Sequence, residues 1–263
     1  MVFCLRVDLE SQKGISKGLP KLLDVLAKYN IKASFYLVMG GESNIFEILM
    51  NRGNVPGASE RGINVFSFFE KIRMALFPMD FVKHNIKILR RIIDEGHELG
   101  VHGWKHRRWT RNLERIDIQK DVSTAVEKYI KLFGPKPKSF CSPAFRTNDS
   151  VITVLEKNGF EIISDYFGDI PSKVKGTNLV NVPVTIKGHM NTPIIENLVV
   201  RGYDDNEIFD YLKNKIKTKK LSVMYVHGLF ECIEKIDLLE KLFLHLNESK
   251  IQNKTLLQAA NKI

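Results

Sequence analysis

Apolar residues along the chain occur in two alternating patterns, short continuous runs and longer stretches with helical spacing. The runs over 2–7 and 32–38 predict buried strands, because runs of about four to eight apolar residues are typical of sheets covered on both faces. Between them, 18–29 carries leucines at i, i+3, i+4 and i+7 and therefore predicts an amphipathic helix. The residues with this spacing are Leu19, Leu22, Leu23 and Leu26.

Strands and helices continue to alternate along the rest of the chain. Further helices are predicted over 80–95, 117–133, 148–158, 207–217 and 233–246. Further strands are predicted over 97–102, 138–142, 160–164 and 221–227, with short candidates over 180–184 and 197–200. Helices between strands, without return hairpins, predict a parallel sheet. Because no glycine-rich nucleotide fingerprint follows any strand, we expect an α/β fold that is a single-domain distorted (β/α) barrel over 1–263, not an open doubly wound sheet.

One segment, at about 40–78, interrupts this alternation. It is long, it lies between a strand and the next helix, and its second half is rich in aromatic residues and carries Lys71 and Arg73. Insertions of this length are usually functional or disordered, and the apolar content argues against disorder. Two interpretations stay open: a lid or interfacial helix that rests on lipid, and a helix packed over the mouth of the barrel.

The charge balance bears on the class of partner. The 263 residues include 40 basic and 30 acidic side chains, giving a net charge of +10. This excess favours an anionic partner such as a phosphorylated substrate or an acidic membrane surface, although a generally lysine-rich composition would give the same value. No nucleic-acid partner is expected, because no recognition motif is present and the lysine-rich stretch at 213–220 is typical of a solvated helix end.

The cysteines and the N-terminus bear on location. Cys4, Cys141 and Cys232 are odd in number and form no CxxC pair, which indicates reduced thiols, and the first two lie in strand patterns that predict burial. The first residues form a strand pattern without the features of a signal peptide, and no apolar run approaches the roughly 18 residues of a membrane span. We therefore expect a cytoplasmic protein, with peripheral contact to the inner face of the cell membrane as an open alternative.

Acidic residues and histidines follow the first and third predicted strands. Asp8 and Glu10 end the first strand, at a spacing that points both side chains to one face if the strand stays extended. His102 and His106 follow the third, and two imidazoles four residues apart can reach one metal ion. Either pair alone could be a solvated strand end or a chance spacing. Because barrel enzymes carry reactive groups at the carboxyl ends of their strands, the four residues together predict a site for metal-assisted hydrolysis.

Four more polar residues are candidates for this site or for the core. His227 ends the strand at 221–227 and is either a general acid or a core histidine bonded to backbone. Arg146 could hold a catalytic acid in place or bind an anionic group, and Asp165 could pair with it; ordinary surface ion pairs are the alternative. His97 begins its strand, at the opposite end from the site, and is predicted to be structural. No Gly-x-Ser-x-Gly elbow, P-loop or HExxH motif offers another chemistry.

In this order along the chain, the candidate residues resemble the motifs of the polysaccharide deacetylase (NodB-homology) superfamily. Within it, the chain is most similar to the deformylases that act on lipid-linked 4-formamido-arabinose, and the aromatic insertion occupies the same place as one in those enzymes. The likeness covers nearly the whole chain and is weak in the insertion and over 187–202. The stretches that carry it are 5–8, 18–20, 102–106, 145–149 and 182–185.

The resemblance implies a role for each candidate residue. A divalent metal ion, Zn²⁺ first and Co²⁺, Mn²⁺ or Ni²⁺ as alternatives, would be held by Glu10, His102 and His106. Asp8 would be the catalytic base, and His227 the acid that protonates the leaving amine. The remaining positions are expected to bind or orient the substrate, namely Trp104, Arg146 and Asp165.

The implied reaction removes a formyl or acetyl group from the nitrogen of an amino sugar, which could be linked to a lipid phosphate. Two departures stand out: Glu10 occupies a position where the family usually has aspartate, and 141–143 lacks the arginine of the third motif, for which Arg146 is the expected substitute. Two alternatives stay open. One is a deacetylase of a soluble or polymeric N-acetyl sugar, and the other is a non-catalytic module that binds carbohydrate or lipid phosphate around a decayed metal site.

Overall fold

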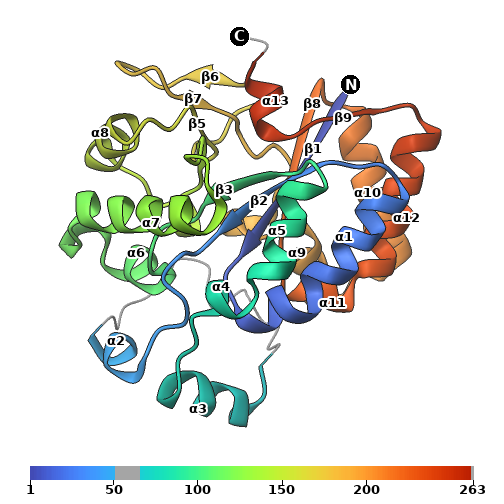
Figure 1. Cartoon of the computed structure of the whole chain (residues 1–263). Helices are drawn as coiled ribbons and strands as arrows, with labels where there is room; N and C mark the ends of the chain where they lie inside the picture. The colour runs from blue at the N-terminus through green and yellow to red at the C-terminus, as the bar shows by residue number, and fades with distance from the viewer. Residues whose placement is uncertain (51–65, 262–263) are drawn as a thin grey trace.

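The computed structural model describes residues 1–50 and 66–261, and its centre is a curled mixed sheet that forms a half-barrel with helices packed around it (Figure 1). The strand order is β6-β7-β5-β4-β3-β2-β1-β8, and β9 pairs with β1. The α/β barrel-like fold expected from the sequence is thereby confirmed. In chain order the strands are β1 (Val2–Leu9), β2 (Ala33–Leu37), β3 (Glu98–Val101), β4 (Ser139–Phe140), β5 (Ile162–Ile163), β6 (Ser172–Lys173), β7 (Val180–Asn181), β8 (Leu221–His227) and β9 (Gln252–Asn253).

The strands that were predicted from apolar runs pair in parallel, and they bring their carboxyl ends to one edge of the sheet. β1 lies between β2 and β8, and its register with β8 sets Asp8 opposite His227. At the other edge the expectation of a sheet without hairpins is wrong, because β6 and β7 run antiparallel. Ser172 and Lys173 are exposed, so the sequence gives no apolar run from which β6 could be predicted.

The predicted helices form, although their bounds differ: some are shorter, α10 begins two residues earlier, and the helices predicted over 80–95 and 233–246 are each divided in two. They are α1 (Leu19–Lys28), α4 (Phe81–His84), α5 (Ile86–Asp94), α7 (Ile118–Phe133), α8 (Asp149–Lys157), α10 (Asp205–Lys217), α11 (Phe230–Glu234) and α12 (Ile236–Glu248). A π-helical turn over Gly14–Gly18 precedes α1. The side chains of Asp80 and Asn148 accept hydrogen bonds from backbone N–H groups of the first turns of α4 and α8, as N-cap residues do.

The candidate strand at 197–200 is wrong, because these residues end helix α9 (Ile194–Val200). Its buried apolar residues are Ile194, Ile195 and Leu198, spaced i, i+1 and i+4. The helical period is therefore visible only when the two isoleucines before Asn197 are included. Two further short helices, α6 (His106–Asn112) and α13 (Leu256–Ala260), were also not predicted.

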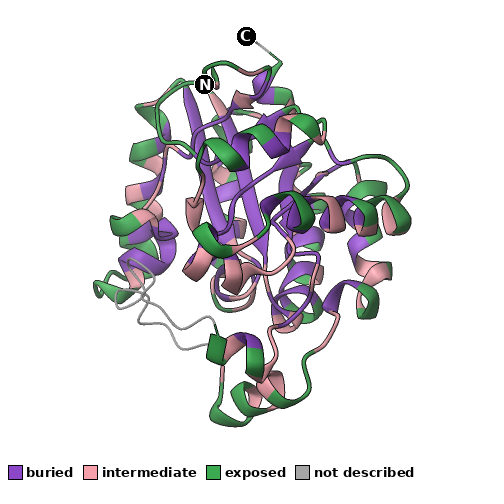
Figure 2. Cartoon of the chain, turned by 90° about the vertical axis from the view of Figure 1, so that its left-hand side faces the viewer, coloured by how far each residue is buried: buried purple, intermediate pink, exposed green. Residues whose placement is uncertain are grey.

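Buried residues follow the strands and the inward faces of the helices, and exposed residues cover the outside (Figure 2). Cys4 and Cys141 are buried, as expected, and so is Cys232. Arg6, in the middle of β1, is also fully buried among these apolar side chains. A buried guanidinium requires a compensating charge, and the carboxylate of Asp8 on the same strand supplies it.

The segment at 40–78 forms two short helices, α2 (Ile45–Met50) and α3 (Phe68–Leu76), while 51–65 within it lies outside the described residues. Both helices lie at the end of the molecule to which β1 and β2 point their carboxyl ends (Figure 1). Among the helices of the described residues, none is long and apolar enough to cross a bilayer.

Candidate active site

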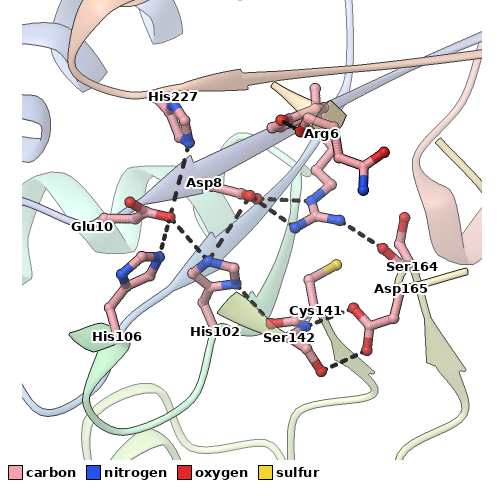
Figure 3. A network of polar contacts seen from close by, with 12 residues as sticks. Arg6, Asp8, Glu10, His102, His106, Cys141, Ser142, Ser164, Asp165 and His227 are labelled. Atoms are coloured by element: carbon pink, nitrogen blue, oxygen red, sulfur yellow. Dashed lines mark hydrogen bonds and ion pairs between the residues drawn. The ribbon is translucent and has the colours of Figure 1, made fainter. Parts of the chain in front are cut away.

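The carboxyl ends of β1, β3 and β8 bring Glu10, His102, His106 and His227 together (Figure 3). One carboxylate oxygen, Glu10 Oε1, lies 3.1 Å from Nε2 of His102 and 2.9 Å from Nε2 of His106. The same oxygen is 4.0 Å from Nε2 of His227. The sequence predicted this convergence because parallel strands end at a common edge.

His102 and His106 reach the site from different elements. His102 follows β3 directly, Gly103 makes the turn with a positive φ of 73°, and His106 begins α6. A Cβ at Gly103 would lie 3.0 Å from the indole nitrogen of Trp109, so this turn leaves no room for a side chain. The two imidazole rings end 5.5 Å apart between centroids. The pair therefore depends on a glycine turn and not on one helical face.

The hydrogen bond at Nδ1 of His102 fixes the tautomer of its imidazole ring. Nδ1 lies 2.7 Å from the carbonyl oxygen of Cys141, which only accepts hydrogen bonds, so Nδ1 carries the proton. In the neutral ring, Nε2 then presents a lone pair toward Glu10 Oε1. Two lone pairs at 3.1 Å repel each other unless a proton or a cation lies between them.

The residues present fit a divalent metal ion for this reason. Two imidazole nitrogens and one carboxylate oxygen are ligands that zinc and its neighbours accept, and the ligand atoms of Glu10, His102 and His106 all lie within 4.8 Å of one another. The carbonyl of Cys141 would act as the outer partner that orients a metal-binding histidine. The side chain of Glu10 brings its Oε1 within 3.1 Å of both imidazole nitrogens.

Asp8 is held by an arginine that the sequence analysis did not assign. Arg6 donates from Nε and Nη2 to the two carboxylate oxygens of Asp8, both at 2.8 Å, and from Nη1 to the carbonyl of Ser164 at 2.6 Å. Asp8 Oδ2 lies 3.9 Å from Nε2 of His102. Since residues i and i+2 of a strand share a face, the spacing of Arg6 and Asp8 was a signal for this pair.

Arg146 is therefore not the substitute for the missing arginine of the third motif. It donates to Glu114 and to the carbonyl of Thr110. Its expected pairing with Asp165 is also wrong, because both carboxylate oxygens of Asp165 accept from Ser142, one from the backbone and one from the hydroxyl, each at 2.7 Å. Asp165 thus braces the turn that carries the Cys141 carbonyl.

His227 is oriented by a glutamate from α9. Its Nδ1 lies 2.7 Å from Glu196 Oε1, and its backbone N–H donates to Glu231 Oε2. Burial alone would lower the pKa of His227, but the carboxylates of Glu196 and Glu10 outweigh it and raise the pKa to about 10. Burial and the neighbouring Glu196 raise the pKa of Glu231 to about 8. His227 can therefore carry a proton on the nitrogen that faces Glu10.

Trp104 lies between the two candidate histidine ligands in the chain, and it lines a cavity of about 530 Å³ to which α2, α6 and α7 also contribute. Its backbone N–H donates to Asp121, which also accepts from the indole of Trp109. Gly40 approaches so closely that a Cβ there would lie 2.2 Å from the Trp104 carbonyl. The main chain of Trp104 is thus fixed.

Comparison with known protein families shows the family of the chain. A family model described as "Polysaccharide deacetylase" matches residues 9–163, which include every candidate metal ligand. The chain belongs to the polysaccharide deacetylase family.

Relatives in this family agree with the fold. A protein of Shewanella sediminis named "Probable 4-deoxy-4-formamido-L-arabinose-phosphoundecaprenol deformylase ArnD" is 24% identical over 94% of this chain and 82% of its own length. A solved probable polysaccharide deacetylase of Pseudomonas aeruginosa aligns with a TM-score of 0.70 at 13% identity, covering 99% of this chain and 89% of its own. A solved family pseudoenzyme of Bacillus anthracis aligns at 0.59 and 14% identity, covering 98% and 65%. At these identities the solved structures show the fold alone.

Proposed function

We propose that the protein is a metal-dependent hydrolase that removes a formyl or acetyl group from the nitrogen of an amino sugar carried on a lipid phosphate. The observation that carries this proposal is the approach of Glu10 Oε1 to the Nε2 atoms of His102 and His106, with the His102 tautomer set by Cys141. The family supports the amide class, and the name of the Shewanella sediminis relative supports a lipid-linked sugar.

Each residue has a distinct part in this mechanism. Glu10, His102 and His106 would hold the ion, which supplies a Lewis acid that polarises the carbonyl and lowers the pKa of a water molecule. Asp8 would accept a proton from the attacking water molecule, with Arg6 fixing the direction of its carboxylate. His227 donates the proton that the leaving nitrogen needs, with Glu196 holding its ring.

The first test is the metal content of the purified native protein and of His102→Ala, measured by elemental analysis. We expect about one divalent ion per chain in the native protein and a large loss in the variant. Little metal in the native protein, even after incubation with Zn²⁺, would reject the hydrolase and favour the binding module. The Bacillus anthracis pseudoenzyme gives that second candidate a precedent within the family.

The second test concerns the acyl group. Formate and acetate are measured separately after incubation with N-formyl and N-acetyl amino sugars, both free and linked to a lipid phosphate. Formate release from the lipid-linked sugar supports the proposed substrate. Acetate release from a free or polymeric sugar alone would replace it with the soluble deacetylase.

A further inference from the structure

Large apolar side chains are exposed together on α2, α3 and the residue that follows α3. They are between 41% and 81% exposed, and the two helices contact each other. Figures 1 and 2 show both helices at one end of the molecule, outside the body formed by the sheet. We call these side chains the apolar lobe; its members are Phe46, Leu49, Met50, Phe68, Phe69, Ile72, Leu76 and Phe77.

Helix α3 is amphipathic, but it directs its apolar face to solvent and its polar face to the body of the protein, the reverse of a helix that packs on a core. Phe68, Ile72 and Leu76 are spaced at i, i+4 and i+8 and form an outward stripe. The polar residues face the body: Glu70 pairs with Lys13 at 3.2 Å, and Arg73 pairs with the buried Glu42 at 2.8 Å. Ion pairs thus anchor the helix to the body while its apolar face is left in solvent.

The charges beside the apolar lobe indicate what covers it. Arg107 on α6 donates to the carbonyl of Ile48 on α2, at 3.5 Å, and Arg111 follows one turn later. In residues 1–50 and 66–261, no carboxylate pairs with either guanidinium, and Arg107 Nε is buried without a hydrogen-bond partner. Lys71, on the flank of the α3 stripe, is exposed. Exposed aromatic side chains bordered by cations without carboxylate partners match the boundary between anionic headgroups and acyl chains.

We propose that the apolar lobe, with Arg107 and Arg111, is the surface by which the protein docks on an anionic lipid bilayer. This inference deepens the proposed function and rests on it, since a lipid-linked sugar has to be reached at the membrane. The docking end also carries the site, because α6, which holds both arginines, begins at His106. Docking would therefore turn the metal-ligand cluster toward the headgroups.

The test is flotation of the full-length protein with vesicles of phosphatidylglycerol or of phosphatidylcholine, without substrate. We expect binding to the anionic vesicles that weakens as salt rises, and weaker binding to the neutral ones. The double variant Phe68→Ser/Phe69→Ser should reduce partition at least about tenfold, because two aromatic rings no longer enter the acyl region. Ile170→Ser is the matched control, since this exposed residue lies beside β6 at the opposite end of the molecule, and its partition should not change.

A second variant separates charge from apolar insertion. Arg107→Gln/Arg111→Gln should bring binding to anionic vesicles down to the level of neutral ones and flatten its salt dependence. Unchanged flotation of the phenylalanine variant, or none of the native protein, would overturn the proposal. So would a native dimer in light scattering that the phenylalanine variant abolishes, because a second copy would then cover the lobe. Metal analysis of the native protein keeps the two proposals apart: a native protein that floats but holds no metal would retain the docking surface and lose the hydrolase.

Discussion

His97 and His102 stand at opposite ends of β3, both buried, and their rings make opposite hydrogen bonds. His97 Nδ1 accepts the backbone N–H of Ala33 at 3.2 Å, so its proton lies on Nε2, which has no hydrogen-bond partner within the described parts of the chain. His102 Nδ1 instead donates to the Cys141 carbonyl, and its Nε2 is left to face Glu10. Whether the backbone group at Nδ1 is a donor or an acceptor therefore decides which histidine can hold a metal.

The largest loss of turnover should come from removing the imidazole of His102, whose Nε2 lone pair faces Glu10. His102→Ala should lose the metal and lower turnover by about a thousandfold or more, because Lewis-acid stabilisation by the ion is worth several kcal/mol. His97→Ala is the matched variant and should keep the metal. The distinction between His97 and His102 would be contradicted if both variants kept the metal, or if both lost it while circular dichroism showed that they remained folded.

Asp8→Asn should lower turnover by about 10²- to 10⁴-fold, the range of a lost general base. It should also reduce the free energy of unfolding by about 3 kcal/mol, because the buried guanidinium of Arg6 loses its compensating charge. Turnover and urea denaturation measure the two effects separately. Full activity in this variant would mean that another group accepts the proton.

His227→Ala should keep the metal and lower turnover by roughly 10²-fold or more, since the leaving nitrogen then takes its proton from water. Glu196→Gln is the milder companion: the amide can still bond Nδ1, but it no longer raises the pKa of His227. We expect an intermediate rate for it. A native rate in His227→Ala would assign the acid to a different residue.

The sequence was sufficient to predict that the groups at or shortly after the carboxyl ends of the strands would converge. Glu10, His102, His106 and His227 each follow or end an apolar run, so their meeting edge could be predicted from the parallel order of the sheet. The sequence could not predict whether each histidine Nδ1 accepts or donates a hydrogen bond, because this depends on which backbone group of a neighbouring segment faces the ring. That group is the N–H of Ala33 for His97 and the carbonyl of Cys141 for His102.

The partners that the sequence did not reveal come from elements whose position tertiary packing sets. Glu196 lies on α9, whose last residues carry the strand-like run 197–200, and Glu231 lies on a short helix after β8. Arg146 was paired with Asp165 on sequence order alone, but the fold places it beside Glu114. The pairing of Arg6 with Asp8 could have been predicted, because the two residues are spaced i, i+2 along β1.

The last prediction concerns stability alone and tests the structural histidine, His97, through pH. Burial, helped by Lys32 and Arg91, lowers the pKa of His97 to about 4. The unfolded chain then binds a proton below its ordinary value of about 6.5, whereas the folded protein does not until about 4. Stability from this residue is therefore complete above about pH 6.5 and falls as pH drops toward 4, by about 3 kcal/mol at most.

His97→Asn should flatten this part of the pH profile, since its amide oxygen can accept from Ala33 and does not titrate. Urea denaturation of the native protein and the variant between pH 4 and pH 7 measures the difference, and His84→Asn, at an exposed site, is the control. Native and His97→Asn curves that run parallel over this range would mean that His97 gains a proton without cost. The added proton would then lie on Nδ1, which could no longer accept from Ala33, and Glu95 Oε2, 3.9 Å from Nε2, would be near enough to stabilise the charged ring. In that case both histidines would carry a proton on Nδ1, and the hydrogen bond at Nδ1 would no longer distinguish the two ends of β3.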